Sequence, residues 1–197
     1  MVRTADPLIL ASTSPRRREL LTQLGIPFIV VPSPYQETNE AGLLPDHLVR
    51  EQSLGKALAV VPDYPHQLIL GADTLVVCAG EVFGKPASFQ EAQIMLQKLQ
   101  GRWHEVYTGV ALVQGDTADV YHEVTQVQMA PLGSLDIDRY IETGEPLDKA
   151  GAYGIQGAGA AFIEAIQGCY TNVVGLPLPL LYRQLKARGW FVGQVTD

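Results

Sequence analysis

The stretch "LILASTSPRRRELL", Leu8–Leu21, carries the strongest local signals for the fold. Three apolar residues lead into a short Ser/Thr turn, which is typical of a buried strand that ends in a loop. Ser14 can then cap a helix, and Pro15 suits the first helical position because its φ is fixed and it has no N–H to pair. Leu20 and Leu21 supply an apolar face. The stretch therefore predicts a strand followed at once by a helix.

Arg16, Arg17 and Arg18 occupy the first turn of this helix. The aligned peptide dipoles already place about half a positive charge at a helix N-terminus, so an exposed cation there is unfavourable by about 0.3–1 kcal/mol. A bound anion would reverse this effect, because free N–H groups and guanidinium groups would then point at one phosphate-like ligand. A solvated basic patch is the alternative, since runs of charge are usually surface. The sequence by itself leaves both interpretations open.

Composition and isolated residues exclude several classes of protein. The 197 residues are 47% hydrophobic, and no apolar run approaches the ~20 residues that a membrane span needs. The net charge of −7, from 14 Lys+Arg and 21 Asp+Glu, argues against a nucleic-acid-binding surface. Cys78 and Cys169 stand alone, which predicts neither disulfides nor zinc, and we interpret His104 and His122 as structural. We expect one domain over 1–197, in the cytoplasm, that binds no nucleic acid and no membrane.

Strand and helix patterns alternate along the rest of the chain. We expect strands at 27–35, 67–77, 102–114 and 119–130, the last two joined as a hairpin. We expect helices that start at a cap on Asp46, at 88–99, from Ser134 and within 175–189. This order predicts a mixed α/β fold rather than a plain doubly wound sheet.

Asp73 is the most informative single residue. It lies in the apolar run 67–77, where a buried carboxylate is costly unless it is hydrogen-bonded, paired or bound to a metal. An Asp at the open end of a strand that bonds a turn is a structural explanation of equal weight. Gly71 favours a functional role slightly, because a strand glycine lets a ligand or another stretch of backbone approach closely.

Two other segments contain residues suited to phosphate binding. Lys85 lies in "GEVFGKP" (80–86), which is not a phosphate-binding loop because three residues separate the glycines and a proline follows the lysine. The lysine is a candidate phosphate contact or an ordinary turn residue. Segment 144–168 holds 6 of the 19 glycines, with Asp148 and Lys149 at its rim. It suits a loop that wraps a ligand, or an irregular connection without one.

Six motifs together resemble the Maf family of nucleoside triphosphate pyrophosphatases. They are "LASTSPRRRELL" (10–21), "GADT" (71–74), "GKP" (84–86), "GRWHEVYTGVAL" (101–112), "TGEPLDKAGAYGIQG" (143–157) and "NVVGLPL" (172–178). Each motif is short, but all six follow one another in the family's order. The resemblance is therefore specific, and it covers most of the chain.

The resemblance implies a fold, an activity and partners. The fold would be a mixed twisted sheet with flanking helices, in two lobes around a central cleft, as in the related house-cleaning pyrophosphatases that act on inosine or xanthosine triphosphates. The activity would be hydrolysis of a nucleoside triphosphate to the monophosphate and pyrophosphate. A divalent cation, Mg²⁺ or Mn²⁺, would be the cofactor, and the protein would form a homodimer.

The resemblance also implies roles for individual residues. Asp73 would be the catalytic carboxylate, as a general base or as a metal ligand, and Glu37 would join it at the metal. Arg16, Thr74 and Gln156 match the branch that prefers dTTP and UTP. The residues that would hold the substrate are Ser12, Arg16, Arg17, Lys56, Thr74, Lys85, Lys149 and Gln156.

Two other functions would use a similar set of residues. A nucleotide-binding regulator of cell division would need the same phosphate contacts, but it would not need Asp73. A phosphoryl-transfer kinase is disfavoured, because the sequence has neither a phosphate-binding loop nor a kinase signature. Conversion of a nucleotide to its monophosphate separates the enzyme from the regulator.

Overall fold

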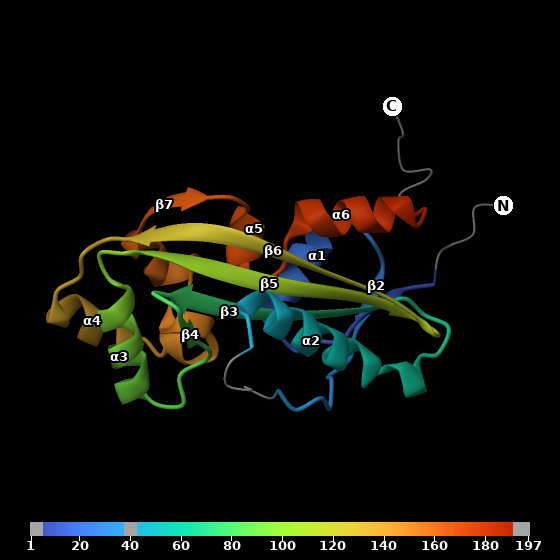
Figure 1. The fold of residues 1–197 in the computed structure, drawn as a ribbon, viewed down its shortest axis with the longest axis horizontal. Coiled ribbons are helices and arrows are strands. Elements are labelled where there is room, and N and C mark those ends of the chain that lie inside the picture. Colours follow the sequence, from blue (N-terminus) through green and yellow to red (C-terminus); the bar gives the residue numbers. More distant parts are fainter. Residues whose placement is uncertain (1–5, 38–42, 191–197) are drawn as a thin grey trace.

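The computed structural model describes residues 6–37 and 43–190, and a long mixed sheet organises them (Figure 1). The strand order is β2-β1-β3-β5-β6-β7, and β4 pairs with β3. The strand β1 is parallel to β2 and β3, whereas the pairs from β3 through β5 and β6 to β7 are antiparallel. The strands are β1 (Leu8–Leu10), β2 (Phe28–Val30), β3 (Ile69–Cys78), β4 (Glu81–Phe83), β5 (Trp103–Gln114), β6 (Thr117–Met129) and β7 (Ile163–Gln167).

Helices cover both faces of the sheet. The helices α1 (Pro15–Gln23) and α6 (Leu178–Ala187) lie on one face, and α2 (Pro45–Leu58) lies on the opposite face (Figure 1). The helices α3 (Phe89–Leu99) and α4 (Ser134–Glu142) lie together at the other end of the long strands (Figure 1). The shorter segments are α5 (Tyr170–Val174) and the 3-10 helices η1 (Val61–Asp63), η2 (Glu145–Asp148), η3 (Ala150–Ala152) and η4 (Gly157–Phe162).

The core follows the alternation of side chains along the strands. In β1, Leu10 packs with Leu181 of α6 in one cluster, whereas its neighbour Ile9 packs with Ala57 of α2 on the other face. A separate cluster around Leu96 lies beneath α3 and α4. Two groups of helices with their own apolar clusters therefore flank one sheet. The predicted mixed α/β sheet with flanking helices is confirmed.

Two strand glycines bring α2 unusually close to the sheet. A Cβ at Gly71 of β3 would lie 2.1 Å from the carbonyl oxygen of Ser53, and a Cβ at Gly109 of β5 would lie 2.0 Å from that of Val49. Backbone oxygens in a helix cannot give way by that much, so only glycine fits at either position. The glycine beside Asp73 therefore admits backbone rather than a ligand. This packing places Lys56, in the last turn of α2, against β3.

The first helix and the hairpin are confirmed with small changes at their ends. The hydroxyl of Ser14 accepts a hydrogen bond from the N–H of Arg17, and Pro15 occupies the first helical position. The hairpin is β5 and β6, and Gln114 pairs with Thr117. The second strand therefore begins at Thr117 rather than at residue 119, since two residues suffice for the turn.

Two predicted boundaries are wrong. The strand predicted for 27–35 ends at Val30, because the prolines at 32 and 34 have no N–H to extend its pairing. Asp46 does not cap α2, since Leu44 is the N-cap residue and the helix begins at Pro45. The fixed φ of this proline starts the helix two residues earlier than a cap on Asp46 would, and Asp46 stands in the first turn, where its charge complements the helix dipole.

In the described ranges, no helix has the length and apolar character of a membrane span. Cys78 and Cys169 are free thiols, as their isolation in the sequence predicted.

His104 is a buried structural residue, as the sequence analysis proposed. Its Nε2 atom lies 2.7 Å from the hydroxyl oxygen of Tyr153, and the two rings meet edge to face with centroids 5.2 Å apart. Burial lowers the pKa of His104 from 6.5 to about 4. A backbone hydrogen bond at Arg102 raises this pKa, but by less than burial lowers it. His122, in contrast, is exposed.

We expect His104 to lower the free energy of unfolding by about 3 kcal/mol as the pH falls from 7 to 4. Between the two pKa values the unfolded chain binds more protons than the folded chain, so stability is complete above pH 6.5 and is lost as the pH falls towards 4. Urea unfolding across this range measures the effect. The His104→Gln variant should show a flatter dependence, whereas the matched His122→Gln variant should follow the wild type. Equal slopes for all three proteins would contradict this assignment.

Candidate active site

A cavity of about 500 Å³ opens beside the N-terminus of α1 and over β3, within the 300–1,000 Å³ typical of small-molecule sites. Its walls come from the end of β1, the last turn of α2, the segment after β4 and residues 144–168, the glycine-rich segment. The structure brings together here every site residue that the sequence predicted, although their roles stay predictions. These residues are Ser12, Arg16, Arg17, Glu37, Lys56, Asp73, Thr74, Lys85, Lys149 and Gln156.

The negative charge of Asp73 is compensated by Lys56 of α2, the helix that packs on β3. Its Oδ1 lies 2.6 Å from Nζ of Lys56, and Glu37 Oε1 lies 2.6 Å from the same nitrogen. The side chains of Asp73 and Lys56 are 8% and 12% exposed, so this pair is buried. Burial alone would raise the pKa of Glu37, but the hydrogen bond and charge of Lys56 outweigh it and lower that pKa. Asp73 lies inside β3, which rules out the structural alternative of an Asp at the open end of a strand.

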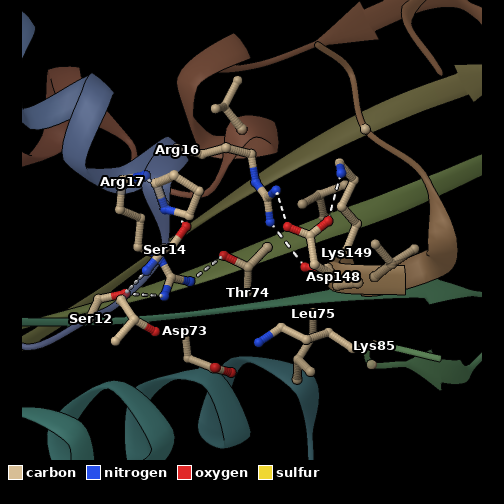
Figure 2. Close-up of a pocket in the computed structure, with 18 of the residues that line it drawn as sticks. Ser12, Ser14, Arg16, Arg17, Asp73, Thr74, Leu75, Lys85, Asp148 and Lys149 are labelled. Atoms are coloured by element: carbon tan, nitrogen blue, oxygen red, sulfur yellow. Dashed lines mark hydrogen bonds and ion pairs between the residues drawn. The ribbon is translucent and has the colours of Figure 1, made fainter. Parts of the chain in front are cut away.

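Arg17 is held by neutral acceptors at the floor of the cavity. Its Nε donates to the carbonyl oxygen of Gly175 at 2.9 Å, and its two terminal nitrogens donate to Ser12 Oγ at 3.3 Å and Thr74 Oγ1 at 3.1 Å. Figure 2 shows the bonds to Ser12 and Thr74. Burial lowers the pKa of Arg17, although the charge of Asp73 opposes this. No carboxylate is hydrogen-bonded to this guanidinium group in the described part of the chain, so its charge is available to an anion.

Arg16 crosses the cavity to the glycine-rich segment. It forms an ion pair with Asp148, whose other carboxylate oxygen pairs with Lys149. Arg18 points into solvent. The three arginines therefore differ in environment. Arg16 and Arg17 line the cavity, as the anion-site interpretation requires. Arg18 is exposed, as the solvated-patch interpretation predicts.

The glycine-rich segment wraps side chains of its own chain. A Cβ at Gly157 would lie 2.7 Å from Glu145 Oε2, and a Cβ at Gly159 would lie 2.6 Å from the hydroxyl oxygen of Tyr140. The carboxylate of Glu145 accepts the N–H groups of Ala158 and Gly159. The expectation that these glycines wrap a ligand is therefore wrong for 157 and 159, whereas residues 153–156 do line the cavity.

Tyr140 and Glu145 are the residues that the sequence analysis missed. The hydroxyl of Tyr140 donates to Glu145 and accepts the N–H of Gly154, next to the cavity wall. The sequence pattern pointed to neither residue. Tyr140 fits the apolar spacing of α4, so it was indistinguishable from a core residue. The hydrogen bonds of Glu145 reach residues that lie 13 and 14 positions further along the chain.

Glu37 and Asp73 are the carboxylates of the cavity that could hold a divalent cation. In residues 6–37 and 43–190, no group of three or more His, Cys, Asp or Glu side chains is placed to hold a metal ion. However, Glu37 and Asp73 already converge on one cationic atom. Two carboxylates completed by phosphate oxygens and water are a common ligand set for Mg²⁺.

Comparisons with known proteins show what this chain is similar to. Residues 7–188 match the family described as Maf-like protein. A protein of Symbiobacterium thermophilum named dTTP/UTP pyrophosphatase is 55% identical over 183 residues, which cover 93% of this chain and 94% of that protein. A protein of the same name from Gloeobacter violaceus is 52% identical over 174 residues, or 88% of this chain and 92% of that protein.

A solved structure shares the fold. The Ham1 protein of Staphylococcus aureus aligns with a TM-score of 0.52 at 13% sequence identity, and the alignment covers 93% of this chain and 100% of that chain. At this level of identity the likeness shows the arrangement of strands and helices alone.

Proposed function

The chain belongs to the Maf family, and from that premise we propose that it hydrolyses nucleoside triphosphates, dTTP and UTP first among them, to the monophosphate and pyrophosphate. One observation carries the proposal: the buried carboxylate of Asp73 lies in a cavity that two arginines and three lysines also line. A triphosphate needs the cations, and a binding protein would not need a buried carboxylate among them. Relatives about half identical over most of the chain are named for this activity.

Cations from three elements would bind the triphosphate. Arg17 lies in the first turn of α1, Lys56 in the last turn of α2 and Lys85 after β4, and all three line one cavity. Figure 2 shows Arg17 and Lys85 reaching into it from different sides. Their charges would neutralise the phosphate oxygens and the pyrophosphate that leaves, in a water-poor site where such contacts are strong. Ser12 Oγ adds a hydrogen bond beside Arg17.

Glu37 and Asp73 would hold the divalent cation, Mg²⁺ or Mn²⁺. A bound divalent ion would polarise phosphate oxygens and make a coordinated water more acidic. The carboxylates meet at Lys56, and this lysine holds Asp73 through Oδ1. Lys56 would therefore keep the Asp73 side chain directed into the cavity.

Asp73 would also handle the proton of the reaction. Its Oδ1 accepts from Lys56, and its Oδ2 has no hydrogen-bond partner among the residues that the structure describes. We propose that Oδ2 accepts the proton of a water that attacks the α-phosphorus. The bond between the α-phosphorus and the bridging oxygen then breaks, and pyrophosphate leaves against the cationic wall.

Base selection would fall to Gln156 with Thr74, and Arg16 would contact a phosphate group of the same nucleotide. The amide of Gln156 offers a donor and an acceptor, which suits the alternating N–H and carbonyl groups of uracil or thymine. We also propose that the protein is a homodimer in the cytoplasm. Light scattering on the purified protein and cell fractionation test these two statements.

We expect kcat/KM for dTTP and UTP to exceed the values for ATP and GTP by about tenfold or more, because a purine leaves buried polar groups unpaired. The experiment is a panel of the four nucleotides with Mg²⁺ or Mn²⁺, with pyrophosphate release and the nucleoside product measured together. Comparable values for all four would contradict the base selection. Binding without any release would favour the nucleotide-binding regulator instead.

A further inference from the structure

The carboxylate of Asp148 bridges two cations of the cavity wall. Its Oδ2 accepts from a terminal nitrogen of Arg16 at 2.8 Å, and its Oδ1 accepts from Nζ of Lys149 at 2.6 Å. Figure 2 shows the carboxylate between these two side chains. Each oxygen serves a different cation, which is the arrangement that two oxygens of one phosphate group would also adopt. Asp148 therefore occupies a position suited to a phosphate.

The two cations are fixed, and the carboxylate is the exposed partner. The side chains of Arg16 and Lys149 are 22% and 13% exposed, whereas that of Asp148 is 59% exposed. Arg16 also donates to the backbone carbonyl of Asp148 at 3.0 Å, and Lys149 donates to the carbonyl of Glu145 at 2.6 Å. These backbone bonds keep both cations in place when the carboxylate rotates outward.

Asp148 differs in this respect from the other carboxylates of the cavity. The side chain of Asp73 is buried in β3 and only 8% exposed, whereas Asp148 ends the short η2 segment at the rim. Burial would raise the pKa of Asp148, but hydrogen bonds from Lys149 and Arg16 outweigh it and lower that pKa. The group is therefore an anion at neutral pH. An exposed ion pair of this kind contributes little to stability, so its placement calls for another explanation.

We propose that Asp148 is an internal competitor for the phosphate position between Arg16 and Lys149. A phosphate group that binds there must first displace the carboxylate from both cations. The cavity therefore holds pyrophosphate less tightly than its cations alone would allow, and the product leaves more readily. This inference rests on the proposed function for its ligand, a di- or triphosphate, and it adds a role for Asp148 in product release.

The test is calorimetric titration of inorganic pyrophosphate into the full chain without metal. We expect the Asp148→Asn and Asp148→Ala variants to bind pyrophosphate about tenfold more tightly than the wild type, because two ion pairs no longer have to break. The Asp119→Asn variant is the matched control. Asp119 is 54% exposed and pairs with Arg188 outside the cavity, so its removal should leave pyrophosphate affinity unchanged.

Hydrolysis assays supply an independent readout. The inhibition constant of pyrophosphate, measured with Mg²⁺ present, should also fall in the two Asp148 variants relative to the wild type. Unchanged or weaker binding of pyrophosphate by both variants would overturn the proposal and leave Asp148 as a positioning residue for Arg16. Failure of the proposed function is a different result: wild-type protein would release no pyrophosphate from dTTP or UTP, and the calorimetric comparison of the variants would still decide the role of Asp148.

Discussion

We expect the Asp73→Asn protein to hydrolyse dTTP about 10²–10⁴-fold more slowly than the wild type, a loss of ~3–5 kcal/mol in transition-state stabilisation. Asn keeps the shape of the side chain, but its amide cannot accept the proton that Oδ2 would take. The amide oxygen can still accept from Lys56, and Glu37 stays paired with that lysine. The variant should therefore fold, and it should bind dTTP in the absence of metal with an affinity near that of the wild type.

Turnover, nucleotide affinity and the free energy of unfolding of this variant together separate the interpretations of Asp73. An enzyme loses turnover and keeps nucleotide binding, whereas a structural Asp loses stability first. The Asp119→Asn variant, which removes an exposed carboxylate outside the cavity, should retain full activity. Near-normal hydrolysis by a well-folded Asp73→Asn protein would exclude the catalytic role.

We expect the Lys56→Met variant to lose about 3–5 kcal/mol in the free energy of unfolding, because it leaves the buried carboxylate of Asp73 without its partner. The Lys56 and Asp73 side chains are only 12% and 8% exposed, so solvent screens this ion pair far less than it screens a surface pair. Met approximates the aliphatic stem and keeps the packing of α2 against β3. Urea unfolding at pH 7 measures the loss. The matched Lys98→Met variant breaks the exposed pair with Glu81 and should lose less than about 1 kcal/mol.

The double variant Lys56→Met with Asp73→Asn tests whether the unpaired charge of Asp73 causes this loss of stability. Removal of the unpaired charge should restore most of the stability that Lys56→Met loses, since replacing both partners of a buried pair costs far less than removing one. Its hydrolysis should stay as low as that of Asp73→Asn alone. A Lys56→Met protein as stable as the wild type would show that Asp73 does not depend on Lys56.

Elements defined by neighbouring residues could be predicted from the sequence. The start of α1 depends on Ser14 and Pro15, and the start of α3 depends on Ser88, whose hydroxyl accepts from the N–H of Glu91. These signals act within one helical turn, so no distant contact is needed to interpret them. The predicted start of α2 was two residues late, because Pro45 and Asp46 both suit the beginning of a helix and local rules do not rank them.

The glycines show where such rules stop. Their number in 144–168 correctly indicated close approaches, but the groups that approach are Glu145 and Tyr140 of this chain at two of the positions. Likewise, Gly71 was correctly associated with a close approach beside Asp73, and the approaching group is the backbone of α2 at Ser53. A glycine indicates that a side chain would not fit at its position, but it does not indicate which group occupies that space.

The sequence by itself determined which residues needed a partner. It placed a carboxylate, Asp73, in an apolar strand and arginines at the N-terminus of a helix, and both placements are unfavourable unless an opposite charge is near. Only the tertiary structure decided the partners: Lys56, 17 positions from Asp73, and Asp148, 132 positions from Arg16. The physical reason is that the energy of a charge pair depends on distance in space and on burial. Both are set by the packing of α2 on Gly71 and by the meeting of α1 with the glycine-rich segment, which no spacing along the chain encodes.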